Sequence, residues 1–224
     1  MNHYRWNLLP PAPDKCLASF SDFPPLVAQL LYNRGVTEPF QLEPFLTADK
    51  RLSGDPFQLP DMHLAIARIY RALLSGENIA IYGDFDADGI TGTALLVQGL
   101  SSLGGKVIPY IPHRLTEGYG LKTAALEKLR QQGISLVITV DCGITALAEV
   151  KRAKRLKLDI IITDHHTPLP EIPTAIAIVN PKRADSAYPF SELTGAGVAI
   201  KLLQALFQSL GKQEQLEELI DLVA

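Results

Sequence analysis

Acidic and histidine side chains gather in three short segments of this sequence. They are GDFDADG at residues 83–89, DCG at 141–143 and DHH at 164–166. Each segment directly follows a short apolar run of the kind that forms a buried strand. Ligand-binding groups of open parallel sheets lie beyond the carboxyl ends of the strands. We therefore expect five carboxylates and two imidazoles to meet at one edge of a sheet.

Such a cluster suits divalent cations. Five acidic groups at one edge would repel each other and raise one another's pKa unless a cation lay between them. Oxygen ligands with one or two histidines suit Mn²⁺ best, with Mg²⁺ or Co²⁺ as alternatives. Two cations that share a carboxylate can hydrolyse phosphoesters, because one activates water and both neutralise charge on the phosphoryl oxygens. The three segments predict a metal-dependent hydrolase of phosphoesters.

The first segment also invites comparison with phosphate-binding glycine loops. GDFDADGITGT at residues 83–93 follows a predicted strand and opens a predicted helix. It lacks the lysine of GxxxxGK[ST], and its acidic groups would repel a bare phosphate, so we expect it to meet phosphate only through a metal. An Asp-Gly pair is also common in ordinary turns. The coincidence of acidic groups at three strand ends favours the functional interpretation.

Two other segments carry groups that suit a phosphate or a base. In residues 113–122 (HRLTEGYGLK), Tyr119 can stack on a base, and the candidates for phosphate contact are His113, Arg114 and Lys122. Gly195 and Gly197 enter a predicted helix, where backbone N–H groups can hold a phosphate. Packing for Tyr119 and simple helix entry for the two glycines remain the structural alternatives. The basic run at 151–157 is expected to be a solvated helix face rather than a DNA-binding patch.

The pattern of apolar residues predicts an α/β domain. Continuous apolar runs indicate buried parallel strands at 79–82, 107–111, 136–140, 160–163 and 176–179. Helices are predicted between them at 91–103, 122–132 and 145–156, followed by one at 194–210. The expected fold is a doubly wound parallel sheet of about five strands.

A helical region is predicted before the sheet. Residues 1–23 are expected to form an irregular arm, and helices are expected at 24–34 and 38–48. Asp61 is expected to cap a further helix that stops at Gly76. A last helix is predicted from Gln213. We predict two domains, a helical region at 1–76 and a catalytic domain at 77–224.

Bulk composition fits a globular protein of a reducing compartment. The 224 residues are 47% hydrophobic and 20% charged, and only two are cysteines. No stretch approaches the roughly 20 uninterrupted apolar residues of a membrane span, and we expect no signal peptide, because no apolar run follows a basic start. We expect a cytoplasmic protein without membrane contact. The net charge of −3 argues mildly against nucleic acid, although loaded metal sites would offset it.

The combined motifs resemble a known family, the DHH-family phosphoesterases. GDFDADGITGTALL, PHRLTEGYGL, TVDCGI, TDHHTP and GAGVA are all similar to the branch of RecJ-like single-stranded-DNA-specific exonucleases. RGV at 34–36 and PFQLPDM at 56–62 extend the resemblance over nearly the whole chain. The resemblance implies metal-dependent hydrolysis of single-stranded DNA from the 5′ end in recombination and repair. It also implies single-stranded-DNA-binding protein and repair helicases as partners.

The resemblance also implies roles for individual residues. The metal ligands would be Asp86, Asp88, Asp141 and His165, with Asp141 as the bridge between two ions. Asp84 would be a direct or water-mediated ligand, Asp164 would orient its neighbours, and His166 would contact the scissile phosphate or assist proton transfer. Tyr82 stands where some relatives have a histidine, which bears on the second metal position.

The family has a further aspartate ligand and a second domain beyond the point where this sequence stops. We therefore expect this chain to be the N-terminal portion of a longer protein and a poor nuclease by itself. Two alternatives stay open. One is a DHH phosphodiesterase that acts on cyclic dinucleotides or oligoribonucleotides. The other is a non-catalytic RecJ-like replication module, which need not bind Mn²⁺ tightly.

Overall fold

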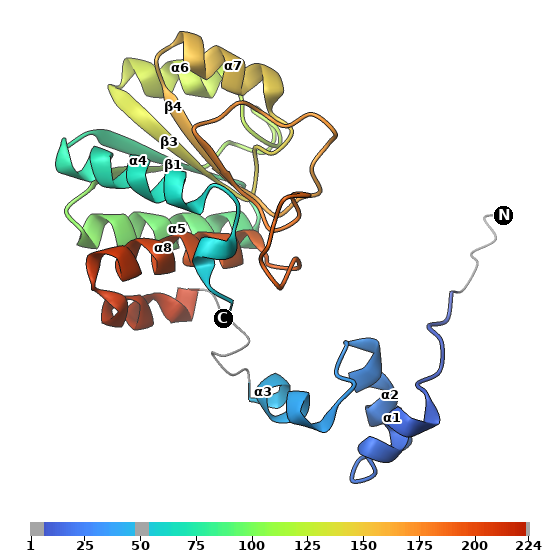
Figure 1. Cartoon of the computed structure of the whole chain (residues 1–224). Helices are drawn as coiled ribbons and strands as arrows, with labels where there is room; N and C mark the ends of the chain where they lie inside the picture. Colours follow the sequence, from blue (N-terminus) through green and yellow to red (C-terminus); the bar gives the residue numbers. More distant parts are fainter. Residues whose placement is uncertain (1–6, 48–53, 223–224) are drawn as a thin grey trace, which may run out of the picture. The chain divides into compact units, whose positions relative to one another are not determined.

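The computed structural model describes residues 7–47 and 54–222 and divides the chain into two compact units (Figure 1). The first unit is Met1–Gly54 and the second is Asp55–Ala224. This boundary lies earlier than the predicted one between residues 76 and 77. The reason is that helix α4 (Met62–Leu74) buries one face in the core of the second unit.

The first unit is a small helical cluster. It contains α1 (Asp14–Ser19), α2 (Pro25–Asn33), η1 (Pro39–Gln41) and α3 (Leu42–Leu46). The prediction of an irregular arm over residues 1–23 was wrong at α1, which forms because Cys16 and Phe20 pack with Leu31 of α2. The predicted helix at 38–48 is a 3-10 turn followed by a short α-helix; its last residue, like residues 1–6 of the arm, lies outside the described residues.

The second unit is built on a five-stranded parallel sheet, as predicted. The strand order is β2-β1-β3-β4-β5, and every neighbouring pair is parallel. The strands are β1 (Asn78–Gly83), β2 (Lys106–Tyr110), β3 (Ile134–Val140), β4 (Asp159–Thr163) and β5 (Ala177–Val179). The apolar side chains of β1, β3, β4 and β5 are buried, which explains why continuous apolar runs located these strands. The edge strand β2 is largely exposed, although its apolar run located it as well.

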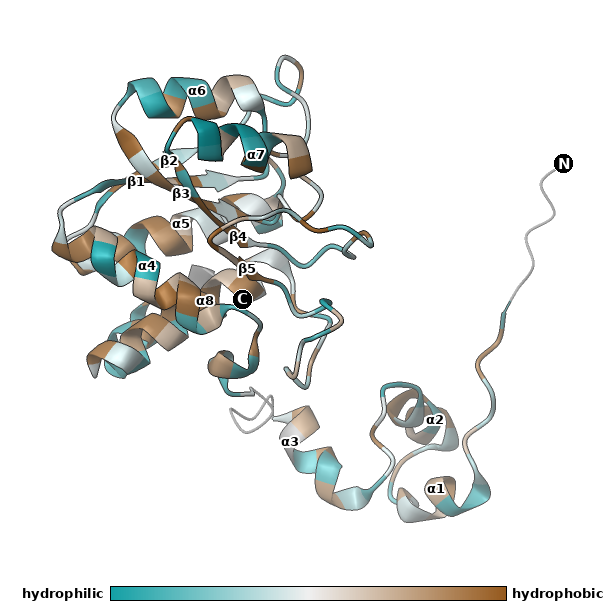
Figure 2. Cartoon of the chain, turned by 45° about the horizontal axis from the view of Figure 1, so that its top comes forward, coloured by the Kyte–Doolittle hydropathy of each residue, from teal (hydrophilic) through white to brown (hydrophobic). Residues whose placement is uncertain are grey.

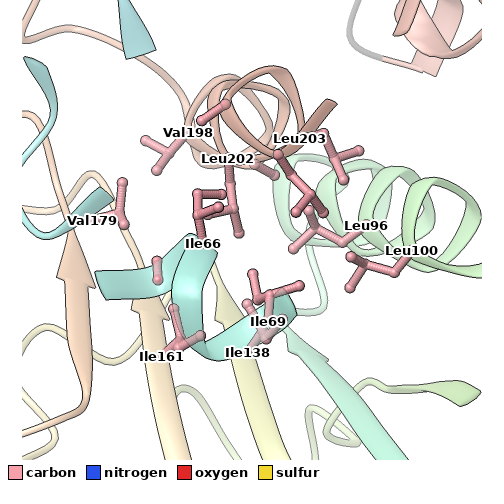
Figure 3. Close-up of a cluster of buried hydrophobic side chains, with 14 of the residues drawn as sticks. Ile66, Ile69, Leu96, Leu100, Ile138, Ile161, Val179, Val198, Leu202 and Leu203 are labelled. Atoms are coloured by element: carbon pink, nitrogen blue, oxygen red, sulfur yellow. The ribbon is translucent and has the colours of Figure 1, made fainter. Parts of the chain in front are cut away.

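Helices cover both faces of the sheet (Figure 1). One face carries α4, α5 (Ala87–Ser102) and α8 (Gly195–Leu210), and the other carries α6 (Thr123–Gln131) and α7 (Leu147–Arg155). Figure 3 shows Ile66 and Ile69 of α4 packed among Leu96, Leu202 and side chains of the sheet. This double covering confirms the predicted fold class.

The start of one helix and the type of another differ from the prediction. Helix α5 begins at Ala87 rather than 91, because the side chain of Asp86 accepts a hydrogen bond from Gly89 N and caps it. The last element, η4 (Gln213–Leu222), is a 3-10 helix rather than an α-helix. Before the sheet, η3 (Pro56–Gln58) leads into α4.

Asp61 precedes α4 as expected, but the prediction that its side chain caps the helix was wrong. Its backbone is left-handed, with φ of 53°, and its carboxylate makes no cap hydrogen bond. Instead Oδ2 accepts hydrogen bonds from Ile178 N at 3.1 Å and from Arg183 Nη1 at 2.6 Å. Asp61 therefore ties the start of α4 to the edge strand β5.

The basic run of residues 151–157 covers the last turns of α7, which is mostly hydrophilic in Figure 2, and the two residues after it. Its lysines are exposed. Arg152 pairs with Glu127 of α6 at 2.7 Å, which fits a solvated helix face. Among the helices that the structure describes, none is long and apolar enough to cross a membrane.

Candidate metal centre

The three acidic segments meet where the strand order of the sheet reverses. Strand β1 runs next to both β2 and β3, so the switch point lies beyond the carboxyl ends of β1 and β3. Asp84 N donates to Val140 O at 3.2 Å, Asp141 N to Thr163 O at 3.1 Å and Asp164 N to Val179 O at 3.1 Å. Each aspartate therefore extends the parallel hydrogen-bond ladder by one step. This places the first acid of every segment at the same edge.

Side-chain ligand atoms form two groups at this edge. The oxygens of Asp84, Asp86 and Asp141 lie within 4.8 Å of one another. The ligand atoms of Asp141, His165 and His166 lie within the same limit. Asp141 belongs to both groups.

Asp141 is held in an unfavourable state by its surroundings. It is 2% exposed, and its φ of 61° is in the left-handed region that non-glycine residues rarely adopt. Within residues 7–47 and 54–222, its Oδ1 has no hydrogen-bond partner, although His165 Nε2 lies 3.0 Å away as an ion-pair contact. Burial, followed by the charges of Asp88 and Asp86, raises the pKa of Asp141 to about 8. Strain of this kind is found where function maintains it.

Asp84 has the same features in milder form. It is buried, and its Oδ1 also lacks a hydrogen-bond partner among the residues that the structure describes. Burial raises its pKa, and the charge of Asp86 adds to the shift. An unpaired buried carboxylate oxygen is costly, so two of them at one edge fit a divalent cation that would bind both.

Asp88 lies beside the two groups and braces helix α8. Its Oδ2 accepts a hydrogen bond from Gly195 N at 2.5 Å and its Oδ1 from Ala196 N at 2.6 Å. Gly197 N is held by the side chain of Thr194 at 3.0 Å. The amides of Gly195 and Gly197 are therefore already engaged and are not free for a phosphate. Simple helix entry accounts for them.

Gly195 has a second structural role. A Cβ atom at this position would lie 2.5 Å from Asp141 Cβ and 2.7 Å from its Oδ1. The absence of a side chain at Gly195 therefore makes room for the Asp141 carboxylate. Sequence spacing carries no signal of this contact, because the two positions lie far apart in the chain and belong to different elements.

Asp164 orients the histidine pair. It is 1% exposed, and its Oδ2 accepts a hydrogen bond from Ile144 N at 2.9 Å. Its Oδ1 lies 2.7 Å from Nδ1 of His166. Burial alone would raise the pKa of Asp164, but the hydrogen bonds from His166 and Ile144 outweigh it and lower that pKa. The same contact with Asp164 raises the pKa of His166.

Comparison with known proteins decides the family. The model of the DHH family, N-terminal domain, matches residues 78–224. The chain belongs to the DHH family. The single-stranded-DNA-specific exonuclease RecJ of Bacillus subtilis is 45% identical over 98% of this chain and 28% of its own length. RecJ of Escherichia coli is 38% identical over 91% of this chain and 37% of its own length.

Solved structures of RecJ proteins also match this chain. An exonuclease RecJ bound to manganese matches with a TM-score of 0.63 and 43% identity over 68% of this chain and 39% of that one. RecJ of Thermus thermophilus in complex with Mn²⁺ matches with a TM-score of 0.64 and 33% identity over 88% of this chain and 27% of that one. The chain thus spans well under half the length of these relatives. A further structure of the Thermus protein is in complex with Mg²⁺, so the relatives contain ions that the sequence predicted.

Aromatic and basic groups of the DHH domain flank the acidic edge. The ring of Phe85 meets that of Tyr119 edge-on at 6.5 Å, and the guanidinium of Arg114 lies 5.0 Å from the Phe85 ring. Tyr119 Oη is 3.4 Å from Nε2 of His166. The structure therefore brings Arg114 and Tyr119 to the site. His113 is exposed, and it is the backbone N–H rather than the ring that is held, by Glu117.

Two residues of this flank were missed by sequence reasoning. Phe85 lies between Arg114 and Tyr119 and contacts both. The sequence contained a signal for it, because Phe85 is a bulky apolar residue within an acidic loop. Glu117 braces the loop by accepting hydrogen bonds from Tyr110 Oη at 2.5 Å and from His113 N at 2.8 Å. No pattern of spacing identified Glu117, because its partners depend on how the loop folds back on β2.

Proposed function

We propose that this chain is the catalytic DHH part of a nuclease that hydrolyses single-stranded DNA from its 5′ end in recombination and repair. The observation that carries the proposal is the pair of ligand groups joined at the buried, strained Asp141. The DHH family and the RecJ relatives give the substrate class. The polarity, the repair role, the protein partners and the cytoplasmic location rest on the resemblance.

Two cations would be held by the acidic edge. Asp84 and Asp86 would bind one ion and His165 the other, with Asp141 between them. Asp88 would lie next to these ligands, because its Oδ2 is 3.8 Å from His165 Nε2. The same carboxylate accepts a hydrogen bond from Gly195 N and so holds the start of α8 in place. When bound, such ions activate water and neutralise charge on phosphoryl oxygens.

His166 has a separate part in the proposal. Its Nδ1 is engaged by Asp164, so Nε2 faces Tyr119. Because Asp164 raises its pKa, more of the imidazole keeps its proton near neutral pH. We assign to His166 the contact with a non-bridging oxygen of the scissile phosphate, through the proton on Nε2.

The flanking aromatic groups suit an unpaired strand. Bases that are not paired expose their faces, and aromatic side chains bind them with little sequence preference. Tyr119 is half-exposed beside His166, and Arg114 is an exposed cation over Phe85. This arrangement favours a single-stranded polymer over a small cyclic substrate.

The test compares this chain with a version extended to the length of its relatives. Each is incubated with Mn²⁺ and single-stranded DNA that is labelled at the 5′ or the 3′ end. We expect mononucleotides from the 5′ end, with the extended version faster, and no product from a matched duplex. Preferential hydrolysis of cyclic dinucleotides or oligoribonucleotides would replace the proposal with a small-substrate phosphodiesterase. Weak Mn²⁺ binding and no hydrolysis by either version would indicate a non-catalytic module.

A further inference from the structure

Two tyrosines stand side by side on the neighbouring strands β1 and β2. Tyr82 of β1 pairs in register with Tyr110 of β2. Their rings stack, with centroids 5.1 Å apart and planes 20° from parallel. Tyr82 is fully buried, and Tyr110 is partly buried against the same apolar cluster. The sheet and the stacking therefore fix the positions of both rings.

Both hydroxyl groups hold the loop between β2 and α6. Tyr110 Oη donates to Glu117 Oε1 at 2.5 Å, and the other oxygen of Glu117 accepts from His113 N at 2.8 Å. Tyr82 Oη donates to Gly120 O at 3.0 Å. Burial, followed by the hydrogen bond with Glu117, raises the pKa of Tyr110 to about 12, so the phenol keeps its proton and remains the donor. The loop is thus held at two points, Glu117 and Gly120.

The two points lie on either side of Tyr119. This residue is half-exposed, and its Oη is 3.4 Å from Nε2 of His166. Its neighbours Gly118 and Gly120 have φ values of 73° and 82°, in the left-handed region. Glycine adopts many backbone conformations, so the two glycines alone would not fix the direction of the ring between them. The hydrogen bonds at Glu117 and Gly120 supply that constraint.

We propose that Tyr82 and Tyr110 are positioning residues for strand binding; this rests on the proposed function. They act through the loop, which carries Arg114 and Tyr119 to the acidic edge, and not by contact with the strand. Because the fold orders the loop in advance, the strand does not have to order it on binding. Removal of the two hydroxyl groups should therefore weaken strand binding and leave the chemical step nearly unchanged.

The test is the double variant Tyr82→Phe/Tyr110→Phe, which removes both hydroxyl groups and keeps both rings. In the extended version, KM and kcat are measured with Mn²⁺ and single-stranded DNA. The Kd for labelled oligothymidine is measured by fluorescence anisotropy with a chelator that prevents hydrolysis. We expect KM and Kd to rise about tenfold or more, because two hydrogen bonds that order the loop are lost. The value of kcat should change less than about twofold, and Mn²⁺ affinity should stay the same.

Tyr188→Phe is the matched control. It removes a hydroxyl group from a tyrosine that is 7% exposed in the apolar cluster on the opposite face of the sheet. This variant should keep the KM and the Kd of the wild type.

Amide hydrogen exchange reports on the loop without DNA or metal, in the chain of residues 1–224. His113 N donates to the Glu117 side chain, and Thr116 N and Glu117 N donate to His113 O. Exchange of these three amides should be about tenfold faster or more in the double variant, because the loop opens more often. It should be unchanged in Tyr188→Phe.

Two outcomes would overturn the positioning role. Faster exchange with the KM and Kd of the wild type would show that the two hydroxyl groups only stabilise the loop. Loss of Mn²⁺ affinity in the double variant would show that the tyrosines act on the metal centre instead. If the double variant does not fold, Tyr110→Phe alone is compared with Tyr188→Phe. A rise in KM of about threefold is then expected, and an unchanged KM would refute the proposal.

The same measurements separate this inference from the proposed function. Weaker binding of oligothymidine by the double variant, in an extended version that hydrolyses no DNA, would keep the positioning role and remove the nuclease. Hydrolysis of single-stranded DNA with the same KM in the wild type and the double variant would keep the nuclease and remove the positioning role.

Discussion

At the scale of single residues, Asp86 and Asp88 of the first acidic loop differ in the hydrogen bonds that their carboxylates accept. Asp86 is exposed and its Oδ1 accepts one hydrogen bond, from Gly89 N at 2.9 Å, as a helix cap. Asp88 gives both of its oxygens to backbone amides of α8. Asparagine caps helices about as well as aspartate. Its side chain has one acceptor oxygen and an NH₂ group that only donates, so it cannot accept a hydrogen bond at both positions as aspartate does.

We therefore predict different effects for Asp86→Asn and Asp88→Asn. Asp86→Asn should leave the free energy of unfolding almost unchanged and weaken Mn²⁺ binding, because a charged ligand is lost. Asp88→Asn should lower the free energy of unfolding by about 1–3 kcal/mol, because one backbone amide loses its acceptor. Urea unfolding and Mn²⁺ titration measure the two effects separately. Equal loss of stability in both variants would refute this division.

The two histidines should also differ. His165 Nε2 lies 3.0 Å from the shared oxygen of Asp141, whereas His166 is engaged with Asp164. We predict that His165→Ala weakens Mn²⁺ binding strongly. His166→Ala should keep most of the affinity and slow hydrolysis in the extended protein. Titration and turnover are measured on the same preparations, and an equal loss of affinity in both variants would contradict separate roles for the two histidines.

Asp141 should make the metal-free chain less stable as the pH rises. Its pKa is raised from 3.8 to about 8, so between these values the folded chain keeps a proton that the unfolded chain releases. The free energy of unfolding then falls with increasing pH across this window and levels off above it. Asp141→Asn removes the titrating group, so its pH dependence should be smaller, by on the order of 3 kcal/mol between about pH 5 and pH 8.

Urea unfolding in the presence of a chelator, at several pH values, checks this prediction. Added Mn²⁺ should reduce the loss of stability of the wild-type chain at the upper end of the window, because the ion favours the charged carboxylate. Parallel curves for the wild type and Asp141→Asn would show that another group dominates the pH dependence.

Sequence reasoning located the acidic residues well and their neighbours poorly. Asp84, Asp141 and Asp164 each follow a buried strand, and parallel strands bring such positions to one edge regardless of other detail. The contact of Gly195 with Asp141 joins α8 to the residue that follows β3, and no local pattern encodes it. The same holds for Asp61, whose carboxylate serves β5 rather than its own helix.

At the scale of elements, β1, β3, β4 and β5 followed from the sequence because burial on both faces leaves a continuous apolar run. The helix α1 was missed because it has only six residues and is held by two side chains that pack on α2. Short helices carry too little periodicity to be recognised, and their stability comes from tertiary packing. The 3-10 form of η4 was missed for a related reason, since apolar spacing does not distinguish the two kinds of helix over a short segment.

The start of α8 should tolerate a methyl group at one glycine and not at the other. A Cβ at Gly195 would lie 2.5 Å from Asp141 Cβ, whereas the nearest atom to a Cβ at Gly197 is 3.4 Å away. We predict that Gly195→Ala lowers the free energy of unfolding by about 1–3 kcal/mol. Displacement of the Asp141 carboxylate should also weaken Mn²⁺ binding, by about 10- to 100-fold.

Gly197→Ala is the matched control. Its new methyl group meets ordinary contacts, and alanine favours a helix over glycine by about 1 kcal/mol. The variant should be as stable as the wild type or slightly more stable, with the same Mn²⁺ affinity. A strong loss of affinity in Gly197→Ala would mean that any change at the start of α8 disturbs the site, and the specific contact with Asp141 would lose its support.

At the scale of the whole molecule, the two compact units have separate cores. The core of Met1–Gly54 is built from Cys16, Phe20, Ala28, Leu31 and Val36. The two core clusters on either side of the sheet contain no described residue before Phe57. Every residue of the proposed metal centre also belongs to Asp55–Ala224. The site and the packing that supports it are thus contained in one unit.

We predict that a chain of residues 55–224 folds and binds Mn²⁺ as the whole chain does. Helix α4 must be kept, because Ile66 and Ile69 fill the core between α8 and the sheet (Figure 3). Thermal unfolding and Mn²⁺ titration should give values close to those of residues 1–224.

A chain of residues 77–224, which begins at the boundary that the sequence suggested, is the informative comparison. It lacks α4, exposes the apolar face that this helix covers and loses the hydrogen bond from Ile178 N to Asp61, so it should unfold or aggregate. If residues 77–224 were as stable as residues 55–224, α4 would be dispensable and the boundary between residues 76 and 77 would be the correct one.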